Sequence, residues 1–358
     1  MLRSRKLLKA ALSTMHYTGA DGLIAPFTSG RGVIFMLHHV TPKTPAAFAP
    51  NGILQVTPEF LESVIVQVRQ AGFDFVALDD VPKRLNSTGQ ERPFAAFTLD
   101  DGYKDNRDYA HPVFKRHGVP FTIYVPSDYA DGNGDLWWLN LEEAIRRLPR
   151  VSLDMDGDTR PFELADDAAR SAAFDEIYWR LRALPESHAR SIVARLAREA
   201  GFDPAALCRD LVMSWDELRE LAGDPLVTIG AHTTGHYALS KLAPEAARNE
   251  IATSVARVSA ELGRPCRHFS YPYGCEASAG EREFEMAREL GLSTAVTTRK
   301  GLLHAHHAQA PTALPRLSLN GDFQDLRYVK VLLSGAPFAL LNAMQRWTRQ
   351  PAGAAVAV

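Results

Sequence analysis

Short apolar segments alternate with amphipathic segments along most of the chain, and this alternation constrains the fold more than any other feature. Val33 to Leu37, VIFML, and Phe94 to Leu99, FAAFTL, are apolar runs of strand length. Between them, Thr57 and Pro58 are typical of the start of a helix, and apolar residues follow at helical spacing as far as Gly72. Repetition of such patterns is typical of βα units around a parallel sheet.

The number of strand segments favours a closed barrel over an open sheet. Besides the two runs already named, the segments expected to form strands are Phe73 to Leu78, Phe121 to Val125, Leu226 to Ala231, His268 to Tyr271, Thr294 to Val296 and Leu314 to Leu319. No glycine-rich phosphate loop follows the first strand, which argues against a dinucleotide-binding fold. We therefore expect an α/β protein, a distorted (β/α)7-8 barrel with a helical insertion.

The insertion is expected where the alternation stops, between about residues 128 and 225. Segments such as ARSAAFDEIYWRLRAL and SHARSIVARLAREAG have helical periodicity, and no strand is expected between them. The predicted organisation is an N-terminal helical extension (1–30), a discontinuous barrel (31–127 and 226–322), the helical insertion (128–225), and a C-terminal helix and tail (323–358). Trp137 and Trp138, near the start of the insertion, either form a wall of a substrate cleft or anchor the insertion to the barrel.

Composition and charge exclude several classes of protein. The chain has 40 basic and 42 acidic residues among 358, and this balance gives no electrostatic case for nucleic acid as a partner. Its 46% hydrophobic and 23% charged residues are typical of a globular protein. Three scattered cysteines and a weak N-terminal signal pattern fit a reducing compartment, so the expected location is cytoplasmic.

No segment is apolar over the roughly 18 residues that a membrane-spanning helix needs. The nearest is Val331 to Gln345, which we expect to be a terminal helix that caps the domain. The alternative for this segment is peripheral contact with a membrane. Arg3, Arg5, Lys6 and Lys9 on an amphipathic N-terminal stretch leave the same two interpretations, a solvated helix face or a membrane-contacting one.

Polar residues gather just after the predicted strands, where the carboxyl ends of parallel strands place functional groups. They are His38, His39, Asp100, Asp101, His232 and Tyr273. Asp100 and Asp101 are adjacent carboxylates whose side chains diverge, so one could bind a metal and the other accept a proton; the alternative is an ordinary Asp-Gly turn. His232 and His236 are spaced to lie on one side of a helical turn, which suits zinc, although two surface histidines could share this spacing.

Two imidazoles and one carboxylate leave a coordination position open, as a catalytic metal requires. A water molecule bound there becomes a nucleophile near neutral pH, and the metal stabilises the oxyanion that forms on an attacked carbonyl. The second aspartate would supply the base. Zinc is the default metal for these ligands, with cobalt, nickel or manganese as alternatives.

Three motifs follow one another along the chain: TLDDG at Thr98 to Gly102, HTTGH at His232 to His236, and SYPYG at Ser270 to Gly274. Together they resemble the polysaccharide deacetylases of carbohydrate esterase family 4, the nodulation-type chitooligosaccharide deacetylase group, over roughly residues 30 to 320. The resemblance implies a distorted (β/α) barrel that removes N-acetyl groups from N-acetylglucosamine units.

The resemblance also implies chemical roles for residues of this chain. Asp100 is implied to be the general base, and Asp101, His232 and His236 the metal ligands. The expected function is metal-dependent removal of N-acetyl groups from oligo- or polysaccharides that contain N-acetylglucosamine. Two alternatives stay open: a hydrolase of another N-acyl or cyclic amide, and a catalytically degenerate saccharide-binding relative. The length and carrier of the saccharide and the oligomeric state are not indicated.

The resemblance also implies which residues bind the substrate and stabilise the oxyanion. The backbone N–H of Tyr273 is implied to donate to the oxyanion, with Pro272 and Gly274 fixing the backbone path that aims it. Pro272 and Tyr273 are therefore expected to contact the substrate. His38 matches a histidine that often ends the first strand in this family, and both a structural and a substrate-binding role are open to it.

The sequence departs from the family pattern at two places. Ser270 stands where many members have an arginine that orients the base, and the late Leu-x-x-His region reads LPRLSLNGD, without the histidine. We hypothesise that Arg316 contacts Asp100 in place of the missing arginine, as a bidentate guanidinium can. The general acid is then an upstream histidine, His38, or Asp100 acting as both base and acid. The upstream histidines are His304, His306 and His307.

Overall fold

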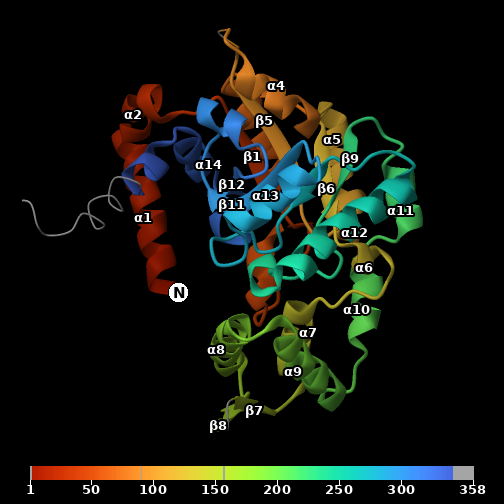
Figure 1. Cartoon of the computed structure of the whole chain (residues 1–358). Helices are drawn as coiled ribbons and strands as arrows, with labels where there is room; N and C mark the ends of the chain where they lie inside the picture. The colour runs from red at the N-terminus through yellow and green to blue at the C-terminus, as the bar shows by residue number, and fades with distance from the viewer. Residues whose placement is uncertain (1, 90, 156–157, 342–358) are drawn as a thin grey trace, which may run out of the picture.

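The structure is a computed structural model of the chain, and it describes residues 2–89, 91–155 and 158–341. Its centre is a parallel β-barrel surrounded by helices, and an insertion extends below the barrel in the view of Figure 1. None of the described helices is long and apolar enough to cross a membrane.

Among the described residues, seven strands close the barrel and pair in chain order. They are β1 (Gly32–Leu37), β5 (Phe94–Leu99), β6 (Phe121–Val125), β9 (Val227–Ala231), β10 (His268–Ser270), β11 (Thr294–Lys300) and β12 (Leu314–Ser318). Every pairing is parallel, and β1 closes the ring because it pairs with both β5 and β12. The predicted distorted (β/α)7-8 barrel is therefore confirmed.

One predicted strand is mostly absent from this ring. The sequence predicts a strand over Phe73 to Leu78, but only β4 (Asp74–Phe75) is extended, and it pairs with β5 outside the closed ring. The apolar residues Val76 and Leu78 suggested a strand; they are buried instead in a cluster with residues of α4 (Val81–Asn86). Apolar composition alone does not distinguish these two arrangements.

Helices cover the outside of the barrel. They include α3 (Pro58–Gln70), α5 (His111–His117), α11 (Trp215–Leu221), α12 (Pro244–Leu262) and α13 (Glu281–Glu289). The helix α3 begins where the sequence predicts, because the Thr57 hydroxyl accepts a hydrogen bond from the Phe60 N–H at 3.1 Å. Shorter elements are β2 (His39–Val40), β3 (Gln55–Val56), the π-helical turn Asn106–Ala110, and the 3-10 helices Pro50–Leu54, Leu78–Asp80, Leu239–Lys241, Ala305–Gln309 and Gly321–Phe323.

The insertion, predicted to be helical over 128–225, also contains two strands. Its helices are α6 (Ser127–Ala130), α7 (Trp137–Arg147), α8 (Asp167–Ala183), α9 (Glu186–Glu199) and α10 (Pro204–Leu211), followed by α11. Between α7 and α8, β7 (Arg150–Met155) and β8 (Asp158–Glu163) form an antiparallel pair. The expectation of no strand is wrong because Val151 and Leu153 alternate with polar residues, which is a strand pattern, and both are buried in the core of the insertion.

An N-terminal helix and a C-terminal helix pack against each other on one side of the barrel. The helix α1 (Leu2–Thr18) lies along α14 (Leu326–Leu333), as Figure 1 shows. Leu12 of α1 is buried in a cluster with Tyr328 and Val331 of α14. This contact attaches the N-terminal extension to the barrel.

The C-terminal segment is divided rather than continuous. The sequence predicts one helix over Val331 to Gln345, but α14 ends at Leu333. Residues 336–341 are helical again, and Gln345 lies outside the described residues. The interruption is at Gly335, whose φ of 76° is left-handed and suits a residue without a side chain.

Side chains of unequal size fill the inside of the barrel. Tyr124 of β6 is fully buried, and Gly230 of β9 is its partner in the strand pairing. A Cβ atom at Gly230 would lie 2.6 Å from the Tyr124 ring and 2.9 Å from the carbonyl oxygen of His268. The lack of a side chain at Gly230 therefore makes room for the Tyr124 ring.

We expect Gly230→Ala to lower the free energy of unfolding by about 1–3 kcal/mol, because the added methyl group overpacks the barrel interior. The measurement is urea unfolding of the wild type and the variant. Gly301→Ala is the matched control, since a Cβ there would meet Pro315 at 3.4 Å, an ordinary contact. Equal losses of stability in the two variants would contradict the packing argument.

Candidate active site

A cavity of about 310 Å³ lies at the carboxyl ends of the barrel strands. Six residues predicted from the sequence line it: His38, Asp100, Asp101, His232, His236 and Tyr273. They follow β1, β5, β9 and β10, so the barrel brings together residues that are far apart in the chain. Parallel pairing places all these strand ends at one rim, which is why a position after a strand was informative.

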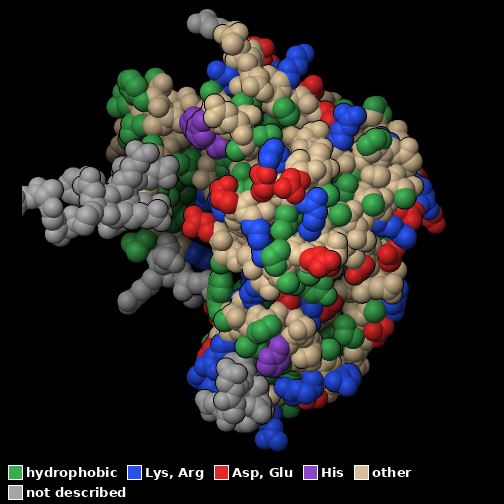
Figure 2. Space-filling model, in the orientation of Figure 1, with side chains coloured by type: hydrophobic (Ala, Val, Ile, Leu, Met, Phe, Trp, Pro, Cys, Tyr) green, Lys and Arg blue, Asp and Glu red, His purple; other side chains and the backbone are tan. Residues whose placement is uncertain are grey.

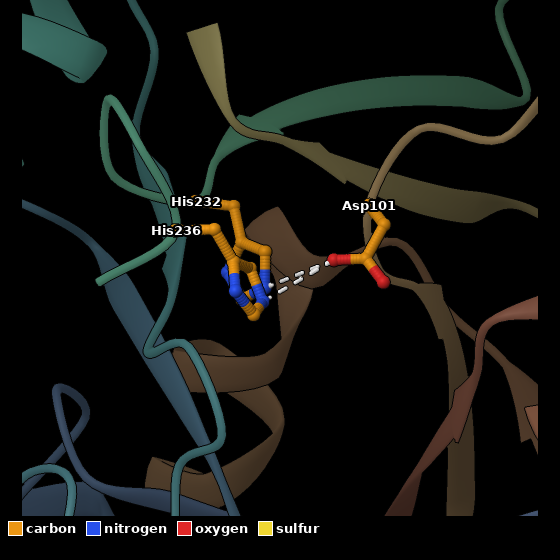
Figure 3. Close-up of side chains that lie close together, drawn as sticks. All are labelled: Asp101, His232 and His236. Carbon is orange, nitrogen blue, oxygen red and sulfur yellow. Dashed lines mark ion pairs between the residues drawn. The ribbon is translucent and has the colours of Figure 1, made fainter. Parts of the chain in front are cut away.

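Asp101, His232 and His236 point toward one another across the cavity (Figure 3). The Nε2 atoms of His232 and His236 lie 3.6 Å and 3.4 Å from Oδ1 of Asp101. Nδ1 of His232 lies 2.6 Å from the carbonyl oxygen of Ser270, which can only accept, so this nitrogen carries the proton. The lone pair of His232 is therefore on Nε2, the atom that faces Asp101.

The environment of Asp101 fits a divalent cation. Its Oδ1 atom is buried and has no hydrogen-bond partner among the described residues. Burial, and after it the neighbouring Asp100 carboxylate, raises the pKa of Asp101 to about 8. A cation bound by this carboxylate and two imidazoles would satisfy the orphaned oxygen and offset the cost of burying its charge.

Asp100 is held by a buried arginine, Arg316, from the strand on the other side of β1. Arg316 of β12 donates to both carboxylate oxygens, from Nη1 to Oδ1 at 2.8 Å and from Nη2 to Oδ2 at 2.7 Å. Burial alone would raise the pKa of Asp100, but the Arg316 guanidinium outweighs it and lowers the pKa to about 2. The contact that the sequence analysis hypothesised is therefore present, and it keeps Asp100 ionised.

The rest of the Arg316 guanidinium is also satisfied, although its side chain is 0% exposed. Nε donates to the carbonyl oxygen of Thr297 at 2.9 Å, and Nη1 donates to the Thr98 hydroxyl at 3.1 Å. Nη2 donates to the hydroxyl of Ser270 at 3.0 Å. Ser270, the position where many family members have arginine, thus accepts from the arginine that replaces it.

Backbone strain is concentrated at this site. Among the described residues other than glycine, a positive φ occurs at Asp101 (75°), Thr233 (63°), His236 (57°) and Tyr273 (60°). This region is unfavourable for residues with a Cβ, and most unfavourable for a β-branched residue such as Thr233. Three of the four residues line the cavity, so the strained backbone is what places their functional groups there.

Tyr273 is fixed from several sides. Its backbone N–H has no hydrogen-bond acceptor among the described residues. Its carbonyl oxygen accepts from the Thr298 hydroxyl at 2.6 Å, and its phenol oxygen accepts from Nε1 of Trp137 at 2.7 Å. Pro272 is buried and does not line the cavity, so its expected contact with substrate is not supported and its effect is on the backbone path. A Cβ at Gly274 would lie 2.5 Å from the Thr298 nitrogen.

The histidines proposed as general acids are in different places. His38 lines the cavity, and burial lowers its pKa to about 4, so the imidazole is neutral near pH 7. The group His304, His306 and His307 follows Leu303, which bridges to Gly32 at the start of β1. That is the amino end of the barrel, opposite the cavity, so none of these three is the general acid. His39 pairs with Asp105 at 2.6 Å and does not line the cavity.

Two charged residues that were not predicted from the sequence support the HTTGH turn, one from the insertion and one from a barrel helix. Arg190 of α9 donates from Nη2 to the carbonyl oxygens of Gly235 and His236, at 2.9 Å and 3.0 Å. Glu250 of α12 accepts from the backbone N–H groups of Thr234 and Gly235, at 2.9 Å and 3.0 Å. The strained HTTGH turn is therefore clamped from both sides, at its carbonyl groups and at its N–H groups.

Aromatic residues of the insertion meet the barrel at the same place. The guanidinium of Arg182 lies 3.5 Å from the centre of the Tyr273 ring, a cation–π contact. Trp137 anchors the insertion through its bond to Tyr273, whereas Trp138 lines the cavity with its ring centre 4.9 Å from that of His236. Each of the two roles weighed for this tryptophan pair is therefore filled by one of them. Phe174, Tyr178 and Trp179 of α8 extend the aromatic wall.

Comparison with known proteins agrees with this arrangement. The family model described as polysaccharide deacetylase matches residues 88–295. A deacetylase from Streptococcus pyogenes, PplD, has a similar fold, with 15% identity, a TM-score of 0.55, and coverage of 84% of this chain and 96% of that one. IcaB from Ammonifex degensii is 18% identical, with a TM-score of 0.53 and coverage of 86% and 97%. The de-N-acetylase from Aggregatibacter actinomycetemcomitans is 15% identical, with a TM-score of 0.52 and coverage of 84% and 99%.

Because the sequence identity to these solved structures is low, the similarity supports the fold alone. A search of curated proteins found no match to the sequence. The family model, in contrast, spans more than half of the chain and includes the TLDDG, HTTGH and SYPYG motifs. The chain therefore belongs to the polysaccharide deacetylase family, and it is a hydrolase that acts on carbon–nitrogen bonds.

Proposed function

We propose that the protein is a metal-dependent N-deacetylase that releases acetate from N-acetylglucosamine units of an oligo- or polysaccharide. The observation that carries this proposal is the pair of adjacent aspartates with opposite surroundings. Asp101 faces two imidazoles with an orphaned oxygen, whereas Asp100 is held ionised by Arg316. One carboxyl group is thereby suited to a cation and the other to accepting a proton.

Asp101, His232 and His236 would hold the metal, with zinc as the default and cobalt, nickel or manganese as alternatives. A divalent ion bound there supplies Lewis acidity, which polarises the amide carbonyl and makes a water molecule more acidic. The Ser270 carbonyl orients the His232 ring, and Arg190 holds the backbone of His236, so contacts with neighbouring residues would position both imidazoles for the metal.

Asp100 would accept the proton of the attacking water. Its bidentate contact with Arg316 fixes both carboxylate oxygens, so the base is oriented before the substrate arrives. A protonated Asp100 beside Arg316 is a strong acid, since its pKa is about 2, and it would pass the proton to the leaving amine. We therefore favour Asp100 as both base and acid over His38, whose imidazole is neutral near pH 7.

The oxyanion and the sugar would be held by other parts of the cavity. The backbone N–H of Tyr273, which has no acceptor in the described part of the chain and is fixed by the strained φ of 60°, would donate to the developing oxyanion. The aromatic side chains of α8 and Trp138 give the cavity flat apolar walls, and Trp179 is 57% exposed at its edge. Flat aromatic surfaces suit the apolar faces of pyranose rings, which favours a saccharide over another N-acyl compound.

The metal and base roles can be separated with two matched variants. We expect Asp100→Asn to lower kcat for acetate release from N-acetylglucosamine oligomers by about 10²–10⁴-fold, because the general base is lost, while bound metal is retained. Asp101→Asn should lose both activity and bound metal, and a chelator should inactivate the wild type reversibly. Acetate release and metal content are the two measurements.

The exposed carboxylate Asp80, which does not line the cavity, provides the control, and Asp80→Asn should keep both metal and activity. Wild-type activity that survives the chelator and the Asp100→Asn change would contradict the proposed mechanism. Oligosaccharide binding without any acetate release by the metal-loaded wild type would favour the degenerate saccharide-binding alternative.

The role of Arg316 can be tested by replacing its guanidinium and by transferring an arginine to position 270. We expect Arg316→Lys to lower kcat roughly 10–100-fold and to shift the pH profile, because lysine cannot make the bidentate contact that orients Asp100. Arg316→Ser combined with Ser270→Arg should recover part of the lost activity, since position 270 also faces Asp100. The measurements are kcat and KM across pH, with circular dichroism as the check on folding. An unchanged kcat and pH profile in Arg316→Lys would refute the positioning role.

A further inference from the structure

The helix α1 and the short helix α2 (Ala20–Thr28) that follows it hold half of the large hydrophobic side chains that are exposed in the described part of the chain. Twelve large hydrophobic side chains are exposed in the described part of the chain, and six of them lie in these two helices. The six are Leu7, Leu8, Tyr17, Leu23, Ile24 and Phe27. Leu23 is 77% exposed and Phe27, one turn further along α2, is 88% exposed. Figure 2 shows apolar side chains gathered over α2 at the upper left.

Of these six residues, Tyr17 helps to attach α1, because its hydroxyl accepts a hydrogen bond from Arg327 of α14. The buried contact of α1 with α14 is made by Leu12. At the end of α2, the Thr28 hydroxyl donates to the carbonyl oxygen of Ser334 at 2.7 Å. These anchoring contacts do not include Leu23 and Phe27, the two most exposed of the six residues. Exposed patches of this kind are typical of interaction surfaces.

The charge of this surface is also one-sided. Asp21 is the single acidic residue in the first 30 positions, and it is only 4% exposed. Lys6 is exposed and Lys9 is half-buried on α1, while Arg5 pairs with Asp322 at 3.0 Å. The side chain of Arg3 lies outside the described residues. The surface therefore combines exposed Leu and Phe side chains with lysines and lacks exposed acidic side chains among the described residues.

We propose that α1 and α2 form a docking surface for an anionic lipid bilayer. Apolar side chains enter the boundary between headgroups and acyl chains, and nearby lysines attract anionic headgroups, which is how interfacial helices bind. A second copy of this chain is a poorer occupant, because a symmetric contact of this face with itself would bring lysines together without acidic partners. The sequence over 342–358 contains Arg346 and Arg349 and no acid, so it offers no complementary charge either.

Docking of this surface would place the cavity close to the bilayer. Arg5 of α1 lines the same cavity as Asp100 and His232, so the N-terminal part of α1 borders the cavity. Figure 1 shows α1 running from the side of the insertion helix α8 toward α2. A saccharide attached to the membrane could then reach the site directly from the surface. This consequence rests on the proposed function, but the docking itself does not.

The test is sedimentation of the full chain with vesicles of phosphatidylcholine, with and without phosphatidylglycerol. We expect binding to the anionic vesicles that weakens as salt is raised, and a fall of about tenfold or more in the partition coefficient for Leu23→Asp with Phe27→Asp. The matched control is Val66→Asp with Tyr109→Asp, which changes two exposed apolar residues elsewhere and should bind as the wild type does. Both double variants should keep the wild-type activity on a soluble oligomer.

Three results would overturn the proposal. The first is no binding of the wild type to either kind of vesicle at low salt. The second is equal binding by the Leu23 and Phe27 double variant and its control. The third is a dimer, seen by light scattering, that only the Leu23 and Phe27 double variant loses, which would make a second copy the occupant. If neither the wild type nor the variants released acetate, this would count against the proposed reaction. The binding to vesicles would still test the docking surface.

Discussion

The buried ion pair between Arg316 and Asp100 is the interaction on which the site depends. An ionised carboxylate away from water needs an equally buried partner, and removing one member of such a pair costs about 3–5 kcal/mol. Asp100 follows β5 and Arg316 lies in β12, and these two strands flank β1. The two side chains meet because β1 pairs with both strands, so the ion pair depends on closure of the barrel.

The surrounding structure maintains a site that is unfavourable by itself. Four residues with a Cβ adopt positive φ there, and such conformations cost about 1–3 kcal/mol each unless neighbouring contacts enforce them. Arg190 and Glu250 bond the backbone of the HTTGH turn from opposite sides, and Arg182 packs on the Tyr273 ring. The insertion is therefore part of the support of the site, and its hydrophobic core also includes Phe48 and Tyr103 of the barrel part of the chain.

The sequence predicted the barrel and most of the site, because both follow from local patterns. The barrel strands, which have three to seven residues, leave apolar runs in the sequence, and the side chains after each run meet at one rim. The β7–β8 pair was missed because its alternation is short and lies among long helices. Arg190 was missed because its partner Gly235 lies 45 positions away and nothing near Arg190 indicates the contact. Conversely, the histidine-rich segment after Leu303 is close to Arg316 in sequence but not in space. It lies at the amino end of β1, away from the cavity, because Leu303 pairs with Gly32.

The departures from the family pattern are consistent with retained catalysis rather than loss of it. The small side chain of Ser270 leaves space for a guanidinium that comes from another strand, and its hydroxyl accepts a hydrogen bond from that guanidinium. A protein that had lost catalysis would have no reason to keep Arg316 in bidentate contact with Asp100, since burying a charged pair costs free energy. The missing late histidine fits the same logic. In the proposed mechanism, an aspartate whose pKa is held at about 2 would return its proton readily, so the leaving amine would not require a separate acid.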